Sequence, residues 1–171
     1  MKAELRRNEI LKYLQLQDEP VSASTLASHF SVSRQIIVGD IALLRAAGEN
    51  ISATPRGYLF EDKGDAGAII REVACIHSAA DMEKELQICV DNGCSVLDVS
   101  VEHPIYGQLT GQLCLSSRYD ISQFMELCKS EQAHALSELT DGLHLHRLKC
   151  PSQDAYDRVC RELRKAKILY K

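Results

Sequence analysis

The stretch SVSRQIIVGDIALLRAAGENISATPRGYLF, residues 31–60, decides the fold of the N-terminal part of the chain because it joins a helical pattern to two short strand-like segments. Ser33 is a good N-cap and Gly48 a suitable C-cap. Between them, apolar residues recur at helical spacing on one face: Ile37, Ile41 and Leu44. Residues 51–60 then predict a β-hairpin that turns around Arg56.

Two further helices are predicted before this stretch. Residues 3–17 carry apolar side chains at helical spacing, and residues 22–30 form a short helix after the break at Pro20. A tight turn separates the second helix from the third, which is the spacing of a helix-turn-helix, and the hairpin would lie beside the third helix as a wing. Residues 1–62 are therefore predicted to form a winged helix-turn-helix DNA-binding domain.

The N-terminal end of the third helix is predicted to enter the major groove of double-stranded operator DNA. Its arginine can pair with phosphate or guanine, its glutamine can contact adenine, and the arginine of the wing can reach the DNA backbone or the minor groove. Gly39 lowers helix stability by about 1 kcal/mol relative to Ala, and it would permit close approach of the backbone. The alternative is a small protein-interaction module with solvated arginines. The predicted DNA-contacting residues are Ser33, Arg34, Gln35, Val38 and Arg56.

Charge and composition divide the chain after this domain. Residues 1–60 carry seven Lys/Arg and six Asp/Glu, whereas residues 61–171 carry thirteen and eighteen, so a head of charge +1 precedes an acidic body of charge −5. This balance is compatible with nucleic-acid binding confined to the head. The polar segment EDKGDAG, residues 61–67, marks the predicted boundary, and residues 68–171 are predicted to form a regulatory and dimerisation domain.

The overall composition is that of a soluble protein. The chain has 171 residues, 45% of them hydrophobic, and no apolar run of transmembrane or signal-peptide length, so we expect a cytoplasmic protein with no membrane partner. Its seven cysteines form no C-x-x-C pair and their number is odd. They are therefore predicted to be reduced and mostly buried.

The body alternates strand and helix patterns in the order βαββαβ, followed by a last helix. This order predicts an α+β fold of the ferredoxin-like, or split βαβ, type. In that topology the first and last strands are antiparallel neighbours. The end of the first strand, which is His77, would then lie near the start of the last strand.

The last strand, GLHLHRL at residues 142–148, carries two histidines on one face, because successive side chains of a strand alternate. His144 and His146 would therefore meet His77. Glu85 falls on the apolar face of the first helix of the body, where a carboxylate needs a cation. These residues predict one divalent transition metal per chain, Zn, Ni or Fe, held by His77, Glu85, His144 and His146.

Two less specific interpretations stay open for these residues. A pair of histidines on one strand is often only a surface or polar-packed pair. Glu85 could lie at the edge of the core and pair with Lys84 or Arg147.

Three dispersed motifs, CIHSAADMEKEL (75–86), VEHPIYGQL (101–109) and GLHLHRL, follow the winged helix in this order. In combination they resemble the three-histidine (3H) domain of the niacin-responsive transcriptional repressors of bacteria. The resemblance covers residues 5 to 170 and implies a homodimeric repressor of genes for NAD biosynthesis or niacin uptake. It also implies nicotinic acid as co-repressor and a metal at the four residues named above.

The turn VEHPIYG, residues 101–107, offers an imidazole and a phenol, from His103 and Tyr106, to a small ligand. The alternative is a turn whose histidine merely satisfies a backbone group. The other histidines, His29 and His134, are assigned to surface or packing.

An enzyme is the alternative class, namely a metal-dependent hydrolase fused to a DNA-binding head. Three histidines and a glutamate already complete a four-coordinate set, whereas catalytic zinc usually keeps an open position. The sequence also has no H-E-x-x-H or G-x-S-x-G motif. We therefore predict that the protein is not an enzyme.

Overall fold

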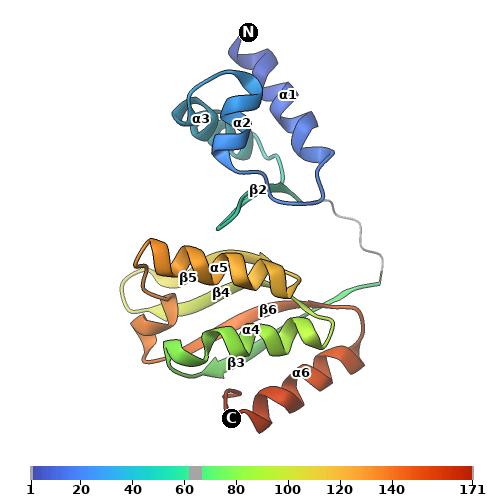
Figure 1. Ribbon diagram of the computed structural model, residues 1–171, viewed down its shortest axis with the longest axis vertical. Coiled ribbons are helices and arrows are strands. Elements are labelled where there is room, and N and C mark those ends of the chain that lie inside the picture. The colour runs from blue at the N-terminus through green and yellow to red at the C-terminus, as the bar shows by residue number, and fades with distance from the viewer. Residues whose placement is uncertain (1, 62–66, 171) are drawn as a thin grey trace. The chain divides into compact units, whose positions relative to one another are not determined.

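The computed structural model describes residues 2–61 and 67–170, which form two compact units, Met1–Asp65 and Ala66–Lys171 (Figure 1). Each unit has its own hydrophobic core. Most of the predicted boundary segment, residues 61–67, lies outside the described residues. The two units are called the head and the body below.

The head consists of three helices and a β-hairpin, as predicted. The elements are α1 (Ala3–Gln15), α2 (Ala23–Phe30), α3 (Arg34–Ala46), β1 (Ile51–Thr54) and β2 (Gly57–Phe60). The side chain of Ser33 caps α3 by accepting a hydrogen bond from the backbone of Ile36. The apolar faces of the helices meet in a core whose fully buried members are Ile10, Leu14, Leu26, Ile37 and Ile41.

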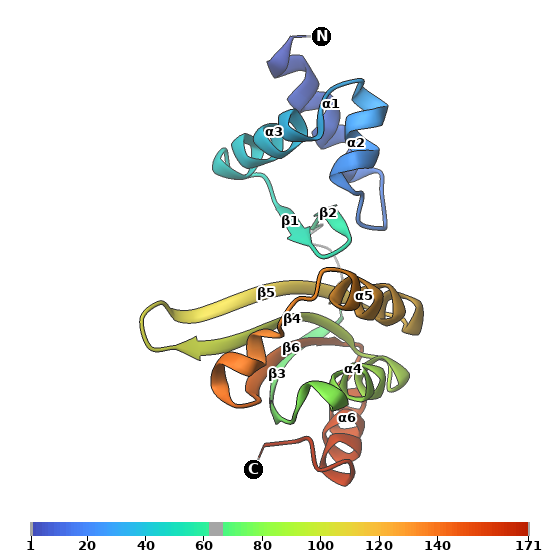
Figure 2. The same cartoon turned by 60° about the vertical axis from the view of Figure 1, so that its left-hand side comes forward.

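The body is a four-stranded antiparallel sheet covered on one face by three helices. Its elements are β3 (Ile69–Ile76), α4 (Met82–Asp91), β4 (Ser95–His103), β5 (Gly107–Leu115), α5 (Arg118–Ser130), β6 (Leu143–Cys150) and α6 (Gln153–Lys165), with short 3-10 helices η1 (Ala79–Asp81) and η2 (Leu136–Thr140). Figures 1 and 2 show α4 between α5 and α6 on this face. The α+β class and the βαββαβ order with a final helix are therefore confirmed.

The strand order of the sheet is β3-β6-β4-β5, which corrects the ferredoxin-like order of the prediction. A ferredoxin-like sheet has its first and third strands inside and its second and last strands at the edges, whereas here β6 and β4 are inside and β3 and β5 are at the edges. Burial explains the difference, because every second residue of β6 is buried while residues 69–72 of β3 are exposed or half-buried. The expected antiparallel pairing of first and last strands is confirmed, from Ile69 opposite Cys150 to Ile76 opposite Leu143.

The end of the chain returns to the outer edge of β3. The backbone N–H of Ile76 donates to the carbonyl of Ile168 at 2.8 Å, and that of Tyr170 donates to the carbonyl of Ala74 at 2.9 Å. These bonds cover the half of β3 that leads to His77.

All seven cysteines lie among the described residues and are free thiols, as predicted. Four are buried and three are half-buried, and the pair Cys94 and Cys150 brings its sulfurs to 2.7 Å.

Candidate metal centre and nucleic-acid interface

The centre forms where β3 and β6 pass beneath α4. The register of the two strands places Cys75 opposite His144 and Val73 opposite His146, and all four side chains point to the helix-covered face. His77 follows the last residue of β3. Glu85 lies in the first turn of α4, on the side that also buries Leu86 and Cys89. The alternation of the strands and the periodicity of the helix thus direct these polar groups to one point.

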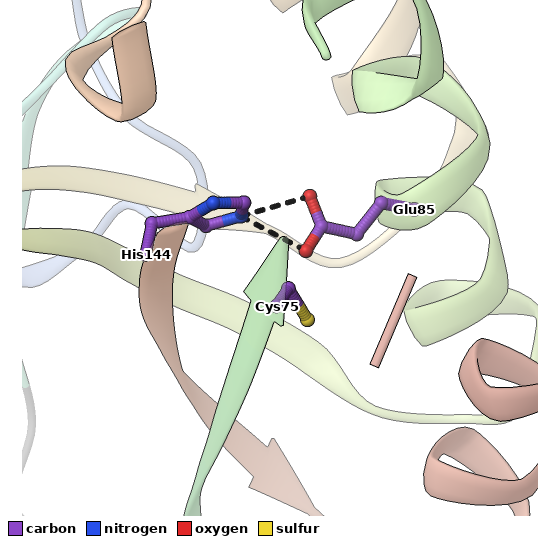
Figure 3. A group of neighbouring side chains, drawn as sticks. All are labelled: Cys75, Glu85 and His144. Carbon is purple, nitrogen blue, oxygen red and sulfur yellow. Dashed lines mark hydrogen bonds and ion pairs between the residues drawn. The ribbon is translucent and has the colours of Figure 1, made fainter. Parts of the chain in front are cut away.

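The Glu85 carboxylate lies at the middle of three imidazoles. Its Oε2 is 2.7 Å from Nε2 of His77 and 3.4 Å from Nε2 of His146, and its Oε1 is 3.0 Å from Nε2 of His144. Figure 3 shows the approach of His144 to both oxygens. All four side chains are at most 4% exposed. The structure therefore brings together the four residues predicted as metal ligands.

The opposite nitrogen of each ring is fixed by the backbone. Each Nδ1 donates to a carbonyl oxygen, so the proton of a neutral ring sits on Nδ1 and the lone pair of Nε2 points at the carboxylate. This is how backbone groups orient histidines that bind metals. The Nδ1 to oxygen distances are 2.7 Å for His77 and Ser78, 2.9 Å for His144 and Gly142, and 2.6 Å for His146 and Asp98.

Three lone pairs and a carboxylate that converge in a buried space repel one another unless protons or a cation lie between them. The donor set of three nitrogens and one oxygen suits Zn(II), Ni(II) or Fe(II), so the residues fit the predicted group. The interpretation that Glu85 lies at the edge of the core is wrong, because Glu85 is 1% exposed and contacts the histidines.

In the metal-free cluster the charge of Glu85 shifts the pKa of neighbouring imidazoles, and the imidazoles shift the pKa of Glu85. Burial raises the pKa of Glu85, but the imidazoles of His146, His144 and His77 outweigh it, and the pKa of Glu85 lies well below its usual value. Burial likewise lowers the pKa of His77 and of His146, but the hydrogen bonds and charge of Glu85 leave both above the ordinary histidine value. The metal-free cluster therefore holds an ionised carboxylate beside His77 and His146, whose imidazoles bind protons more tightly than a free histidine.

These shifts predict opposite pH responses with and without metal. A raised histidine pKa adds stability that is complete below the unfolded value of about 6.5 and disappears as the pH rises through the folded pKa. The lowered pKa of Glu85 adds stability that is complete above about 4.3 and is lost only on further acidification. Metal-free protein should therefore lose stability as the pH rises from about 6 to about 8. Metal binding should instead strengthen over the same range, because protons compete for Nε2.

The measurement is the thermal midpoint across this range, in chelator and with added Ni(II), for wild type and for Glu85→Gln. Subtracting the thermal midpoints of Glu85→Gln from those of the wild type at each pH removes the contribution of titrating groups outside the cluster. A difference between the two metal-free curves that does not change with pH would contradict the coupling.

Gly142 precedes β6 and lies against the residue that follows β3, His77. Its φ is +93°, its N–H donates to the carbonyl of Ser137 at 2.8 Å, and its carbonyl accepts from Nδ1 of His144. A Cβ on this residue would lie 2.4 Å from the carbonyl oxygen of His77. Only glycine combines this backbone conformation with this close approach.

Gly142→Ala is expected to lower the free energy of unfolding by more than about 2 kcal/mol. The left-handed conformation costs about 1–2 kcal/mol, and the contact with the His77 backbone adds to it. Gly93→Ala is the matched control, because its φ is +86° but its nearest neighbour would be the side chain of Pro151 at 3.9 Å. Urea unfolding of both variants measures the difference. Equal losses would mean that the approach to His77 imposes no constraint.

Cys75 was missed by the sequence analysis. Its sulfur, an oxygen of Glu85 and a ring nitrogen of His144 all lie within 4.8 Å of one another (Figure 3). Burial and the charge of Glu85 raise the pKa of its thiol far above the usual range. The signal was present in the sequence, because Cys75 lies two residues before His77 and therefore shares its face of the strand.

His103 and Tyr106 lie together at the tip of the hairpin between β4 and β5. Their rings stack at 5.1 Å, and Nδ1 of His103 accepts the backbone N–H groups of Ile105 and Tyr106. The pairing of β4 with β6 ends at Ser100, so the hairpin extends beyond the strand that carries His144 and His146 (Figure 2). A role of this pair in ligand binding stays a prediction.

The remaining histidines have the packing and surface positions expected of them. His29 packs against the rings of Tyr13 and Phe30. His134 is exposed and its Nδ1 lies 2.9 Å from Glu138.

The start of α3 presents an exposed surface of the kind that reads DNA. Ser33, Arg34 and Gln35 are exposed, whereas Val38 is half-buried against the core of the head. Ile36, which the prediction did not include, is 42% exposed, and an apolar side chain there suits contact with a thymine methyl group. A Cβ at Gly39 would meet no atom within 4 Å, so packing inside the head does not require glycine.

Arg56 lies at the hairpin turn, as predicted, but its guanidinium forms an ion pair with another residue of the head. Its Nη1 is 3.0 Å from Glu19, and only 16% of its side chain is exposed. A role of Arg56 in DNA contact stays a prediction.

A helix-turn-helix head and a body with a buried glutamate among three histidines define a two-domain class of protein. Residues 6–59 match the model of an HTH domain, and residues 70–171 match the 3H domain. The chain belongs to the family of HTH proteins with a 3H domain.

Two relatives cover nearly the whole chain. The transcription repressor NadR of Bacillus subtilis is 40% identical over 168 residues, which are 97% of this chain and 93% of that protein. The probable transcription repressor NiaR of Thermotoga maritima is 40% identical over 164 residues, or 96% and 93% of the two chains. Both relatives are named as regulators, which agrees with the prediction that the chain is not an enzyme and disfavours a metal hydrolase.

Among the described residues, no helix is both long enough and apolar enough to span a membrane.

Proposed function

We propose that this protein is a homodimeric transcription repressor that binds operator DNA through its head and senses nicotinic acid through its 3H domain. One divalent metal per chain, held by His77, Glu85, His144 and His146, forms part of the sensor. The regulated genes are those for NAD biosynthesis or niacin uptake, as the family resemblance implies. The observation that carries the proposal is the Glu85 carboxylate, buried in contact with three imidazoles whose Nδ1 atoms are fixed by the backbone.

A metal at this site could take a fifth ligand beside the four side chains, such as the pyridine nitrogen of nicotinic acid. The chain supplies the orientation. The carbonyls of Ser78, Gly142 and Asp98 hold the three rings so that every Nε2 faces the same point. These carbonyls belong to β4 and to residues that flank β3 and β6. A ligand that shifts the three rings would therefore also shift the backbone of the sheet.

The hairpin pair supports recognition of a carboxylate. Because Nδ1 of His103 accepts two backbone N–H groups, the proton of the neutral ring lies on Nε2, which can donate to an anion. Tyr106 is 72% exposed and adds a phenolic donor. Nicotinic acid presents a carboxylate to such donors, whereas nicotinamide lacks the negative charge and therefore the charge-assisted part of the bond.

Dimerisation follows from the geometry of operator reading. One recognition helix per chain reads one half-site, so a two-fold pair of chains matches a palindromic operator. Nicotinic acid raises DNA affinity only as far as it binds the DNA-competent state more tightly than the other state.

The test is a DNA-binding titration on metal-free and metal-loaded full-length protein with each vitamin. We expect nicotinic acid to be preferred over nicotinamide by at least about tenfold, which is about 1.4 kcal/mol and within the reach of one charged hydrogen bond. Equal strengthening of DNA binding by nicotinic acid after complete metal removal would exclude the metal from sensing. Equal action of the two vitamins would exclude recognition of the carboxylate.

A further inference from the structure

Cys75 lies on β3, beside Glu85 and His144, on the face of the sheet that α4 covers. It is fully buried, and its register partner on β6 is His144, so both side chains point from the sheet toward α4. Figure 3 shows the three residues on three separate elements, β3, α4 and β6. Their ligand atoms lie within 4.8 Å of one another.

These separations are comparable with those between atoms bound to one metal ion. Metal–sulfur bonds measure about 2.3 Å and metal–nitrogen bonds about 2.0–2.1 Å, so two ligands on opposite sides of an ion lie roughly 4.4 Å apart. We propose that Cys75 is a direct ligand of the metal, bound as the thiolate beside His77, Glu85, His144 and His146. This inference rests on the proposed metal site and deepens it.

Charge favours this ligand. A divalent ion with neutral imidazoles and one carboxylate leaves a net charge of +1 in a cluster whose side chains are at most 4% exposed. On binding, the thiol of Cys75 releases its proton to solvent and the sulfur lone pair forms the bond to the ion. The site then carries no net charge. A sulfur ligand also selects Ni(II), Co(II) or Zn(II) over Mg(II) and Mn(II).

The experiment is a titration of full-length, reduced, metal-free protein with Co(II), followed by near-ultraviolet and visible absorption. We expect a sulfur-to-cobalt charge-transfer band that grows to one equivalent in wild type and is absent in Cys75→Ser. Cys89→Ser is the matched control, because Cys89 is also a fully buried thiol and lies one turn after Glu85 on α4. This control should keep the band. Cobalt affinity should fall at least about tenfold in Cys75→Ser.

The outcomes separate the inference from the proposal on which it rests. If wild type binds one cobalt without a charge-transfer band, Cys75 is not a ligand, whatever the variants do, and the site of three histidines and one glutamate stands. A band that persists in Cys75→Ser comes from another thiol and likewise overturns the inference. If wild type binds no stoichiometric cobalt, nickel or zinc, the proposed metal site itself fails. Cys75→Ala provides a second variant should Cys75→Ser not fold.

Discussion

Replacing both histidines of β6, His144→Ala with His146→Ala, is expected to abolish stoichiometric metal binding and, with it, the effect of nicotinic acid on DNA affinity. The change removes two of the proposed ligands and leaves Glu85 with one imidazole. Changes around a metal site that spare its ligands already cost about 10- to 100-fold in affinity. Loss of two ligands should lower metal affinity by more than this. Metal analysis after dialysis should fall from one ion per chain to none.

His134→Ala is the matched control for this variant. It removes an imidazole of the same domain that is exposed and paired with Glu138, so metal content and the response to nicotinic acid should stay unchanged. Circular dichroism should show that the double variant keeps its sheet. Full metal occupancy in the double variant would refute the site. Loss of metal with an intact response to nicotinic acid would separate the metal from sensing.

Arg34→Ala is expected to weaken operator binding by about 1–3 kcal/mol, or roughly 5- to 150-fold, if Arg34 makes a bidentate contact to guanine. It should then also relax base preference at one position of the half-site. If Arg34 pairs with a phosphate instead, affinity should fall equally on all sequences, and the slope of log K against log salt should decrease by about 0.9. Arg34 is the first residue of α3 and is exposed, so its removal should leave the fold intact. Titrations at several salt concentrations on operator and unrelated DNA distinguish the two cases.

Arg45→Ala makes the same change of charge in the last turn of the same helix. Because the N-terminal end of α3 is the end that enters the groove, this variant should have a much smaller effect. If the two substitutions weakened binding to the same extent, Arg34 would act only through net charge. The assignment of the start of α3 as the reading surface would then be wrong.

The sequence predicted that His77, Glu85, His144 and His146 lie together because two periodicities determine their positions. Alternation along β6 places His144 and His146 on one face, and helical spacing places Glu85 with Leu86 and Cys89. The antiparallel pairing of the first and last strands then brings His77 to them. The helices of the head could be predicted equally well, because the cap at Ser33 and the spacing of Ile37 and Ile41 are local signals.

Features that depend on distant contacts could not be predicted in the same way. Which of two neighbouring strands lies at the edge of a sheet depends on what covers its outer side, so the inner and edge strands were exchanged, β3 with β6 and β4 with β5. The requirement for glycine at position 142 comes from the carbonyl of His77, 65 residues earlier in the chain. The partial burial of Val38 depends on the packing of the other helices, which spacing within α3 does not describe, and its contact with DNA stays a prediction.

The inner position of β6 also determines when Glu85 and the three histidines can come together during synthesis of the chain. Within the sheet β3 has β6 as its neighbour, and β4 joins β3 only through β6. A nascent chain that ends before residue 143 can complete its head and can pair β4 with β5, but β3 has no partner strand and Glu85 meets at most His77. Sheet closure and assembly of the centre are therefore the same late event, and they depend on contacts of long sequence separation, which form slowly. A ribosome-bound chain can therefore complete its helix-turn-helix unit before the proposed sensing site exists.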